Sequence, residues 1–448
     1  MTKVLHRHTR TSLPEAAGGD GPYLIDRDGK RYLDGSGGAA VSCLGHNHPA
    51  VVEAVRAQLG RLSYAHTAFF TTETLEALAE HMIEHAPGNL SHVYFVCGGS
   101  EAMESALKLA RQYFLEIGEP QRTHFISRRQ SYHGNTLGAL AVGGNAQRRA
   151  PYQPLLMDAG RVAPCYAYRD QAAGESELQY GRRVADELEQ KIVEIGEHRV
   201  IGFIAETVVG ATAGALPPVE GYFRRIRDIC DRYGVLLILD EVMCGMGRTG
   251  DLYAHAPEGI RADLVTVAKG LGGGYQPIGA TLMDARIYRA IAGGSGAFAH
   301  GHTYLGHALA AAAALAVQQT IQRENLLDNV RARGAQLFEL LRRRLGAHPH
   351  IGDIRGRGLF AGLELVADRG TAAPFPAAVP LHSLLKQAAM QHGLVIYPGS
   401  GTIDGERGHH ILLAPPFICR PAHMHELVDK LSRAIDAALD HIPGDLRP

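Results

Sequence analysis

The chain has 448 residues, of which 46% are hydrophobic and 20% charged, a composition typical of globular rather than disordered proteins. Its 45 Lys and Arg residues nearly balance its 46 Asp and Glu residues, so no overall basic field indicates nucleic-acid binding. The longest apolar run, residues 308–317, is only ten residues long and is too short to span a bilayer.

The first 21 residues lack the apolar stretch of a secretory signal peptide. The six cysteines are scattered, and no two of them form a C-x-x-C pair. In a chain of this length, such cysteines are typical of reduced thiols rather than of a disulfide framework. We therefore expect a cytoplasmic protein that contacts neither a membrane nor nucleic acid.

Short apolar runs recur along the chain and predict its strands. Near the N-terminus, residues 23–25 and 31–33 flank an Asp28-Gly29 turn, which indicates a hairpin. Farther on, we expect strands at residues 92–97, 123–127, 200–205, 235–239 and 263–268, and a helix at 101–114. Because these runs are apolar on both faces and alternate with helical patterns, they predict an α/β fold with a mostly parallel central sheet covered by helices.

The last third of the chain has a different pattern. A long amphipathic helix is expected at residues 325–345, and a glycine-punctuated strand region follows at 351–365. This pattern predicts a smaller α+β domain. We expect a large domain over residues 65–320 and a small domain formed by residues 1–64 together with residues 321–448.

Parallel sheets bind ligands at the carboxyl ends of their strands, so the residues that follow each strand are candidates for a site. Gly98-Gly99-Ser100 ends one predicted strand and begins a helix. The free backbone N–H groups there, with the Ser100 hydroxyl, would form a phosphate cradle. The alternative is an ordinary turn in which Ser100 caps the helix.

Two further strand ends carry charged residues. Asp240 and Glu241 follow the run at 235–239, where a carboxylate needs a metal, a cation or a protonated ring nitrogen unless it only caps the next segment. Lys269 follows the run at 263–268 and precedes a glycine-rich stretch. A partly desolvated lysine there would have a lowered pKa and could form a Schiff base, although a surface lysine is the alternative.

A phosphate cradle, a carboxylate for a ring nitrogen and a Schiff-base lysine are together what pyridoxal 5'-phosphate (PLP) requires. At this point the chain resembles the class-III aminotransferases of fold type I, over roughly residues 21–418. The motifs that carry the resemblance occur in the family's order: Gly99-Ser100-Glu101-Ala102, Ser131-Tyr132-His133-Gly134, Glu206, Leu239-Asp240-Glu241-Val242, Lys269 and His302-Thr303-Tyr304.

The resemblance implies a role for each matched position. Cofactor contacts are implied for Gly99 and Ser100 at the phosphate, Tyr132 and Val242 on the ring faces, His133 beside them, Glu206 at the ring edge, Asp240 at the ring nitrogen and Lys269 at the aldehyde. Lys269 and Asp240 would be the catalytic residues. Thr303 would reach the phosphate of the neighbouring subunit, which implies a homodimer with shared active sites.

The implied reaction moves an amino group from a donor amine or omega-amino acid to a keto acid. Asn135 stands where the acetylornithine and gamma-aminobutyrate branches have an arginine, and Met243 stands where they have a glutamine. Both departures favour the omega-amino-acid or amine:pyruvate branch. A third departure is Thr207, which replaces the usual proline after Glu206. The small residues at 35–40 predict a roomy substrate pocket. Arg407 lies near where amine transaminases place an arginine that binds the acceptor's carboxylate.

Some features of the sequence could indicate functions other than aminotransfer. Gly245-x-Gly247-x-x-Gly250 formally matches a dinucleotide-binding motif, but no helical pattern follows it. The 24 histidines, with His81 and His85 at i, i+4 spacing, could indicate a metalloenzyme, but no Cys or carboxylate completes a ligand set at the usual spacing. A binding protein that kept the fold without the chemistry would not need both Asp240 and Lys269. Within PLP chemistry, an amino-acid epimerase, a lyase and a decarboxylase remain open, because the same residues serve all of them.

Overall fold

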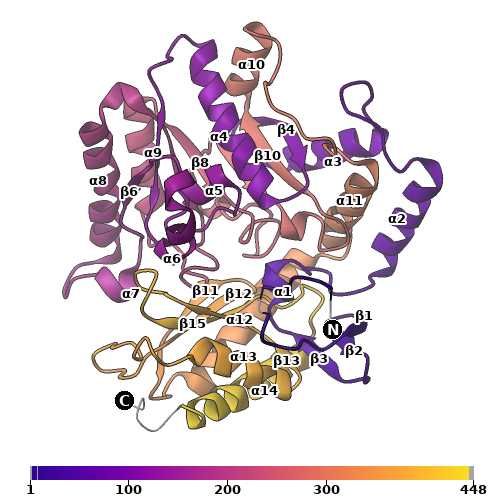
Figure 1. Ribbon diagram of the computed structural model, residues 1–448, viewed down its shortest axis with the longest axis vertical. Coiled ribbons are helices and arrows are strands. Elements are labelled where there is room, and N and C mark those ends of the chain that lie inside the picture. The colour runs from indigo at the N-terminus through magenta and orange to yellow at the C-terminus, as the bar shows by residue number, and fades with distance from the viewer. Residues whose placement is uncertain (1–2, 8, 443–448) are drawn as a thin grey trace.

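The computed structural model describes residues 3–7 and 9–442. Residues 1, 2, 8 and 443–448 belong to the predicted small domain and lie outside the described residues. Figure 1 shows a central sheet with its helices above two smaller sheets and the C-terminal helices. No helix in the described ranges is both long and apolar enough to cross a membrane.

The central sheet has seven strands in the order β4-β10-β9-β8-β7-β5-β6. Its strands are β4 (Leu90–Val96), β5 (His124–Arg128), β6 (Gly160–Val162), β7 (Val200–Glu206), β8 (Leu236–Asp240), β9 (Leu264–Val267) and β10 (Gly279–Asp284). Strand β10 runs antiparallel to β4 and β9, whereas the other neighbouring pairs are parallel. The predicted mostly parallel sheet is therefore confirmed, and β6 and β10 are the two strands in it that the sequence did not predict.

Helices cover both faces of this sheet, because successive side chains of a strand point to opposite faces. Leu237 and Leu239 of β8 pack into one apolar core, and Leu236 and Ile238 pack into the other. The first face carries α3 (Glu73–Glu84), α8 (Glu177–Ile195), α9 (Tyr222–Tyr233) and α11 (Ala308–Arg323), with α2 (Pro49–Arg61) packed on α11. The second face carries α4 (Gly99–Glu116), α5 (Leu137–Val142) and α10 (Ala285–Gly293).

One of the two smaller sheets joins strands from the chain's beginning to a strand near its end, and the other is built from the last third of the chain. One has the order β1-β2-β3-β13, and the other has the order β11-β12-β15-β14. Their strands are β1 (Ala16–Asp20), β2 (Tyr23–Asp26), β3 (Arg31–Asp34), β11 (Ile351–Arg357), β12 (Phe360–Leu365), β13 (Leu394–Val395), β14 (Tyr397–Ser400) and β15 (His409–Leu413). The predicted hairpin is confirmed by the antiparallel pairing of β2 with β3.

Three helices share an apolar core with these sheets: α12 (Leu326–Leu345), α13 (Leu381–Gln391) and α14 (Pro421–Asp440). The remaining short helices are α1 (Gly37–Ala40), α6 (Ala146–Arg149), α7 (Ala167–Asp170) and the 3₁₀ helices η1 (Ala150–Leu155), η2 (Glu197–Arg199), η3 (Ala256–Glu258) and η4 (Lys269–Leu271). Helix α11 runs through residue 320 without a break, and the division into domains at that residue stays a prediction.

The two smaller sheets lie below the central sheet in Figure 1 and are called the lower sheets from here on. Polar contacts connect them to the segments that follow β5 and β7. The Gln130 side-chain amide donates to the carbonyls of Gly401 and Thr402, at 2.6 and 2.9 Å. The buried Arg355 guanidinium donates to the Gly214 carbonyl at 3.1 Å and to Glu364 at 2.6 Å. These contacts fix the position of the lower sheets beneath the carboxyl ends of the central strands.

Candidate active site

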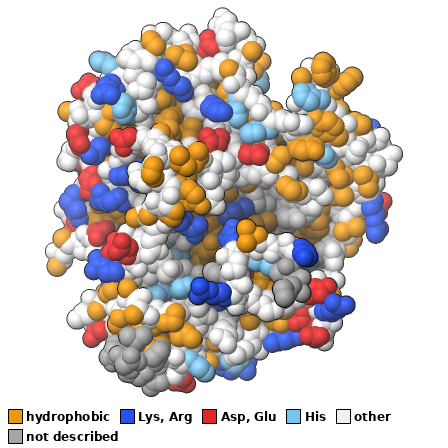
Figure 2. All heavy atoms as spheres, in the orientation of Figure 1, with side chains coloured by type: hydrophobic (Ala, Val, Ile, Leu, Met, Phe, Trp, Pro, Cys, Tyr) orange, Lys and Arg blue, Asp and Glu red, His pale blue; other side chains and the backbone are white. Residues whose placement is uncertain are grey.

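A cavity of about 450 Å³ lies where the carboxyl ends of the central strands face the lower sheets. In the space-filling view, this region is hollowed between the upper and lower parts of the molecule and has Lys and Arg side chains around it (Figure 2). The cavity is lined by eight of the nine site residues expected from the sequence: Gly99, Ser100, Tyr132, His133, Glu206, Asp240, Val242 and Lys269. Thr303 does not line it and is exposed.

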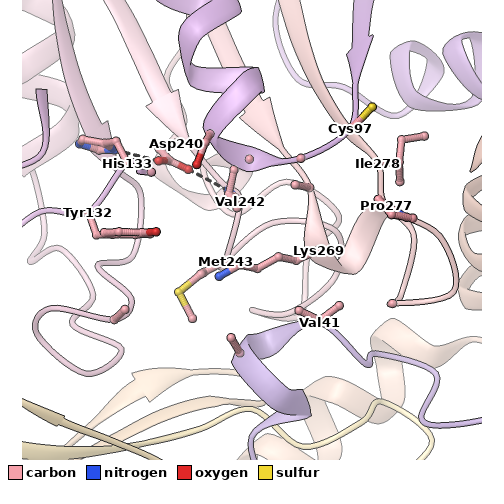
Figure 3. Close-up of a pocket in the computed structure, with 18 of the residues that line it drawn as sticks. Val41, Cys97, Tyr132, His133, Asp240, Val242, Met243, Lys269, Pro277 and Ile278 are labelled. Atoms are coloured by element: carbon pink, nitrogen blue, oxygen red, sulfur yellow. Dashed lines mark hydrogen bonds and ion pairs between the residues drawn. The ribbon is translucent and has the colours of Figure 1, made fainter. Parts of the chain in front are cut away.

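Asp240 is the last residue of β8 and is almost fully buried, at 4% exposure. One carboxylate oxygen lies 2.8 Å from Nδ1 of His133, and the other accepts the Val242 backbone N–H at 3.0 Å (Figure 3). Two contacts therefore fix the orientation of the carboxylate beside the cavity. The other ring nitrogen of His133, Nε2, is buried without a hydrogen-bond partner in the described part of the chain.

Glu241 has a different position from its neighbour. Its carboxylate accepts the Thr207 hydroxyl at 2.9 Å and the backbone N–H groups of Ala254 and His255 at 2.7 and 2.8 Å. The residue is fully buried and does not line the cavity. Of the two adjacent acids, only Asp240 is placed to meet a ligand, and Glu241 together with Thr207 holds the following loop.

Lys269 begins η4 directly after β9, and its side chain extends into the middle of the cavity (Figure 3). Its backbone has φ +47°, in the left-handed region that non-glycine residues rarely adopt. Within the described residues the side chain makes no hydrogen bond or ion pair. Burial lowers the pKa of the Lys269 amine to about 8, although the nearby Asp240 and Glu206 carboxylates act in the opposite direction. At pH 7 about one tenth of this amine is therefore uncharged, far more than for an exposed lysine.

Glu206 ends β7, next to β8 in the sheet. Its two carboxylate oxygens accept the backbone N–H groups of Tyr132 and Gly210, at 3.0 and 2.7 Å. Burial raises the pKa of Glu206, and the Asp240 carboxylate adds to the rise. The exchange of the usual proline for Thr207 thus leaves Glu206 on the cavity wall.

The glycine turn brings the start of α4 close to the strand ends. Gly98 is extended and caps α4 without any side-chain hydrogen bond, so Ser100 is not the helix cap. A Cβ atom on Gly99 would lie 2.8 Å from Cγ1 of Val242, so glycine is needed for this close approach. The Ser100 hydroxyl accepts the backbone N–H of Asn135 at 3.0 Å. The first amides of an 18-residue helix thus face the cavity uncapped, as a bound phosphate requires.

The positions that depart from the family pattern are not all in the cavity. Met243 and Ala39 line it, whereas Asn135 is exposed and does not. Arg407 is exposed and does not line it either, and its Nε lies 2.6 Å from an Asp404 carboxylate oxygen. The structure therefore does not bring Arg407 into the site.

Several lining residues were missed by the sequence analysis: Arg7, Val41, Cys97, Arg148, Pro277, Ile278 and Tyr397. Most are apolar or lie in loops without a motif. Arg148 lies on the four-residue α6, and nothing in its local sequence indicated a site. Tyr397 comes from β14, so the lower sheets contribute part of the wall.

The two rival sites lack the surroundings that they require. After Gly245-x-Gly247-x-x-Gly250, the next helical element in the described chain is the short η3, so no long helix presents its N-terminus to a pyrophosphate. Among the described residues, no group of three or more His, Cys, Asp or Glu side chains is arranged to hold a metal ion.

The fold and the cavity define a PLP-dependent enzyme of fold type I, and comparison with known proteins gives the family. The family model described as aminotransferase class III matches residues 6–435, and the chain belongs to this family. It is therefore an aminotransferase that uses PLP.

Known aminotransferases are similar to this chain over nearly its whole length. An uncharacterised aminotransferase of Schizosaccharomyces pombe is 43% identical over 96% of this chain and 94% of its own. A taurine–pyruvate aminotransferase of Bilophila wadsworthia is 35% identical over 93% of this chain and 91% of its own. An amine transaminase of an uncultivated Pseudomonas species, solved in a PLP-bound form, superposes with a TM-score of 0.91 at 35% identity, covering 97% of this chain and 99% of that one.

Proposed function

We propose that this enzyme moves an amino group from an amine or omega-amino acid to a keto acid, with pyruvate as the preferred acceptor. The observation that carries the proposal is that Lys269 and Asp240, at the ends of the adjacent strands β9 and β8, face one cavity beside an uncapped helix start. When bound, PLP supplies an aldehyde that condenses with amines and a pyridine ring that accepts electrons.

Lys269 would hold the cofactor's aldehyde and, once displaced by a donor, act as the base and then the acid that moves a proton at the reacting carbon. An amine with a pKa of about 8 can accept and return a proton near neutral pH. The Asp240 carboxylate would keep the ring nitrogen protonated, and His133 with the Val242 amide would hold that carboxylate in place.

The other lining residues would position the cofactor. The backbone at Gly99 and the Ser100 hydroxyl would bind its phosphate at the start of α4. Tyr132 and Val242 would pack on the two faces of the ring, and Glu206 would lie at its edge. A Cβ atom on Gly99 would lie 2.8 Å from Cγ1 of Val242, so a side chain at residue 99 would displace the valine. The glycine at this position supports the proposed arrangement.

We further propose a homodimer in which Thr303 completes the partner's phosphate site. Thr303 is exposed rather than directed into its own cavity, as a residue that serves another subunit would be. Large apolar side chains are exposed in the same region: Phe69 and Phe70 at 79% and 67%, and Tyr304 at 59%. Light scattering should show a dimer, and Thr303→Ala should weaken PLP binding.

We also propose a cytoplasmic location, which the six free cysteines support.

The preference for pyruvate rests on the two departures from the family pattern at Asn135 and Met243, of which only Met243 lines the cavity. An asparagine cannot form the charged bidentate pair that an arginine makes with a second carboxylate, which a dicarboxylic acceptor such as 2-oxoglutarate carries.

The test is a panel of amines and omega-amino acids, each offered with pyruvate and with 2-oxoglutarate in parallel. We expect pyruvate to be aminated faster, and Lys269→Ala to remove turnover together with the absorbance of the bound cofactor. A Lys269→Ala variant with full turnover would contradict the assigned role. Racemisation, elimination or decarboxylation of the donor, without amine appearing on either acceptor, would instead identify one of the alternative PLP reactions.

A further inference from the structure

Besides Lys269, the cavity is lined by two cations, Arg7 and Arg148. Both acids on the cavity wall already have partners: Asp240 is held by His133 and a backbone amide, and Glu206 by two backbone amides. The side chains of Arg7 and Arg148 form no ion pair or hydrogen bond with any described residue. The cavity therefore has positive charge at its mouth that the protein itself does not neutralise.

Arg148 is the better positioned of the two. Its guanidinium carbon lies over the Tyr132 ring, 4.8 Å from the ring centre, so a cation–π contact holds the side chain against this ring. Its backbone N–H donates to the Asn145 side chain at 3.1 Å, which fixes the start of α6. The ideal Cβ position of Gly405 lies 3.3 Å from the Ala146 nitrogen, so the loop before β15 packs on the same helix.

A contact of this kind uses no N–H group of the guanidinium as a hydrogen-bond donor, so these groups stay free to donate. The edge of a guanidinium matches a carboxylate, which can accept two parallel hydrogen bonds. Because a keto-acid acceptor carries a carboxylate next to its reacting carbonyl, its recognition needs such a donor close to Lys269. Neither Asn135 nor Arg407 supplies one, since neither lines the cavity and Arg407 is paired with Asp404.

From this geometry we infer that Arg148, held against Tyr132, binds the carboxylate of the keto-acid acceptor at the mouth of the cavity. This inference rests on the proposed aminotransfer to a keto acid. It assigns acceptor recognition to α6, on the side of the cavity that bears Tyr132.

The experiment compares pyruvate with acetaldehyde, its counterpart without the carboxylate, as acceptors for one amine donor. Arg148→Gln should raise the KM for pyruvate roughly tenfold to a hundredfold, the range for a lost hydrogen bond to a charged group, and leave the kinetics with acetaldehyde almost unchanged. Arg148→Lys, which keeps the charge without the bidentate edge, should fall between the two. Arg149→Gln is the matched control, because Arg149 is the next residue on α6 but does not line the cavity.

Four results would overturn the inference. The first is an unchanged KM for pyruvate in Arg148→Gln. The second is an equal loss with both acceptors, which would indicate that Arg148 only supports Tyr132. The third is an equal loss in Arg149→Gln, and the fourth is a larger effect of Arg7→Gln or Arg407→Gln, which would reassign the role.

A binding measurement separates this inference from the proposed function. Wild-type protein that turns over no donor with any acceptor would refute the proposed function. Calorimetric titration of pyruvate into the wild-type and Arg148→Gln proteins would still decide the role of Arg148. We expect weaker binding in the variant, and equal affinities would count against the inference.

Discussion

Lys269 should destabilise the folded, cofactor-free protein at neutral pH, because its charged form is disfavoured by burial. The pKa of its amine falls from the ordinary value of 10.5 to about 8 on folding. Below pH 8 the lysine carries its proton in both the folded and the unfolded chain, and the full penalty is present. Between the two pKa values only the unfolded chain keeps the proton, so the free energy of unfolding rises with pH.

The size of this effect follows from linkage. Between pH 7 and pH 10, Lys269 should add at most about 2–3 kcal/mol to the free energy of unfolding. The value is an upper limit because the amine faces a cavity that water can enter. Lys269→Met removes the titrating group, and this variant should be more stable than the wild type at pH 7 while losing its activity.

The assay is urea unfolding of both cofactor-free proteins at the two pH values. Other groups titrate in this range, so the measured quantity is the difference between the two proteins in their change with pH. Lys386→Met, at an exposed lysine of α13, is the matched control and should change with pH as the wild type does. If the wild type and Lys269→Met gained or lost the same stability between pH 7 and pH 10, burial would not have lowered the pKa of Lys269.

Three further outcomes are expected. Asp240→Asn should retain PLP, as measured by absorbance, but lower kcat on the order of a hundredfold, because the ring nitrogen loses its charge partner. Near-normal rates would show that the role of Asp240 is misassigned. Gly99→Ala would place a Cβ atom 2.8 Å from Val242. Because such overpacking costs about 1–3 kcal/mol, a titration should show PLP binding weakened about tenfold. Unchanged affinity would show that Val242 moves freely. Arg355→Met should lower the free energy of unfolding by about 1–3 kcal/mol, because the fully buried Glu364 loses one of its two cations, at 2.6 Å, and keeps Arg169. Adding Glu364→Gln should recover part of the loss, and an additive double variant would argue against this coupling.

Much of the fold was predictable from apolar runs. Strands β7, β8 and β9 are buried along their whole length, and burial of both faces produces the continuous apolar pattern that the sequence shows. Strand β10 escaped prediction because it begins with glycine, ends with aspartate and contains a threonine, although all six of its residues are buried. Its antiparallel direction is set by pairing with β4 and β9, which no local pattern reveals.

The site was predictable where chemistry depends on residue type and position after a strand, as for Asp240 and Lys269. Residue type alone did not decide between Asp240 and Glu241, and the family resemblance selected Asp240. The different position of Glu241 depends on Thr207 and on the loop at residues 254–255, which no local pattern reveals. Arg148 could not be predicted either. Its position against Tyr132 arises from the packing of α6 beside a loop more than 250 residues farther along the chain.

The Gln130 contacts have a consequence for protein engineering. Gln130 lies two residues before Tyr132, and its amide is bonded to the carbonyls of Gly401 and Thr402. A chimaera that imports residues 401–408 from another transaminase would therefore alter the support of the aromatic ring unless position 130 were exchanged with it. Loop grafting for new substrates should treat the two segments as one transplantable unit, although about 270 positions separate them in the chain.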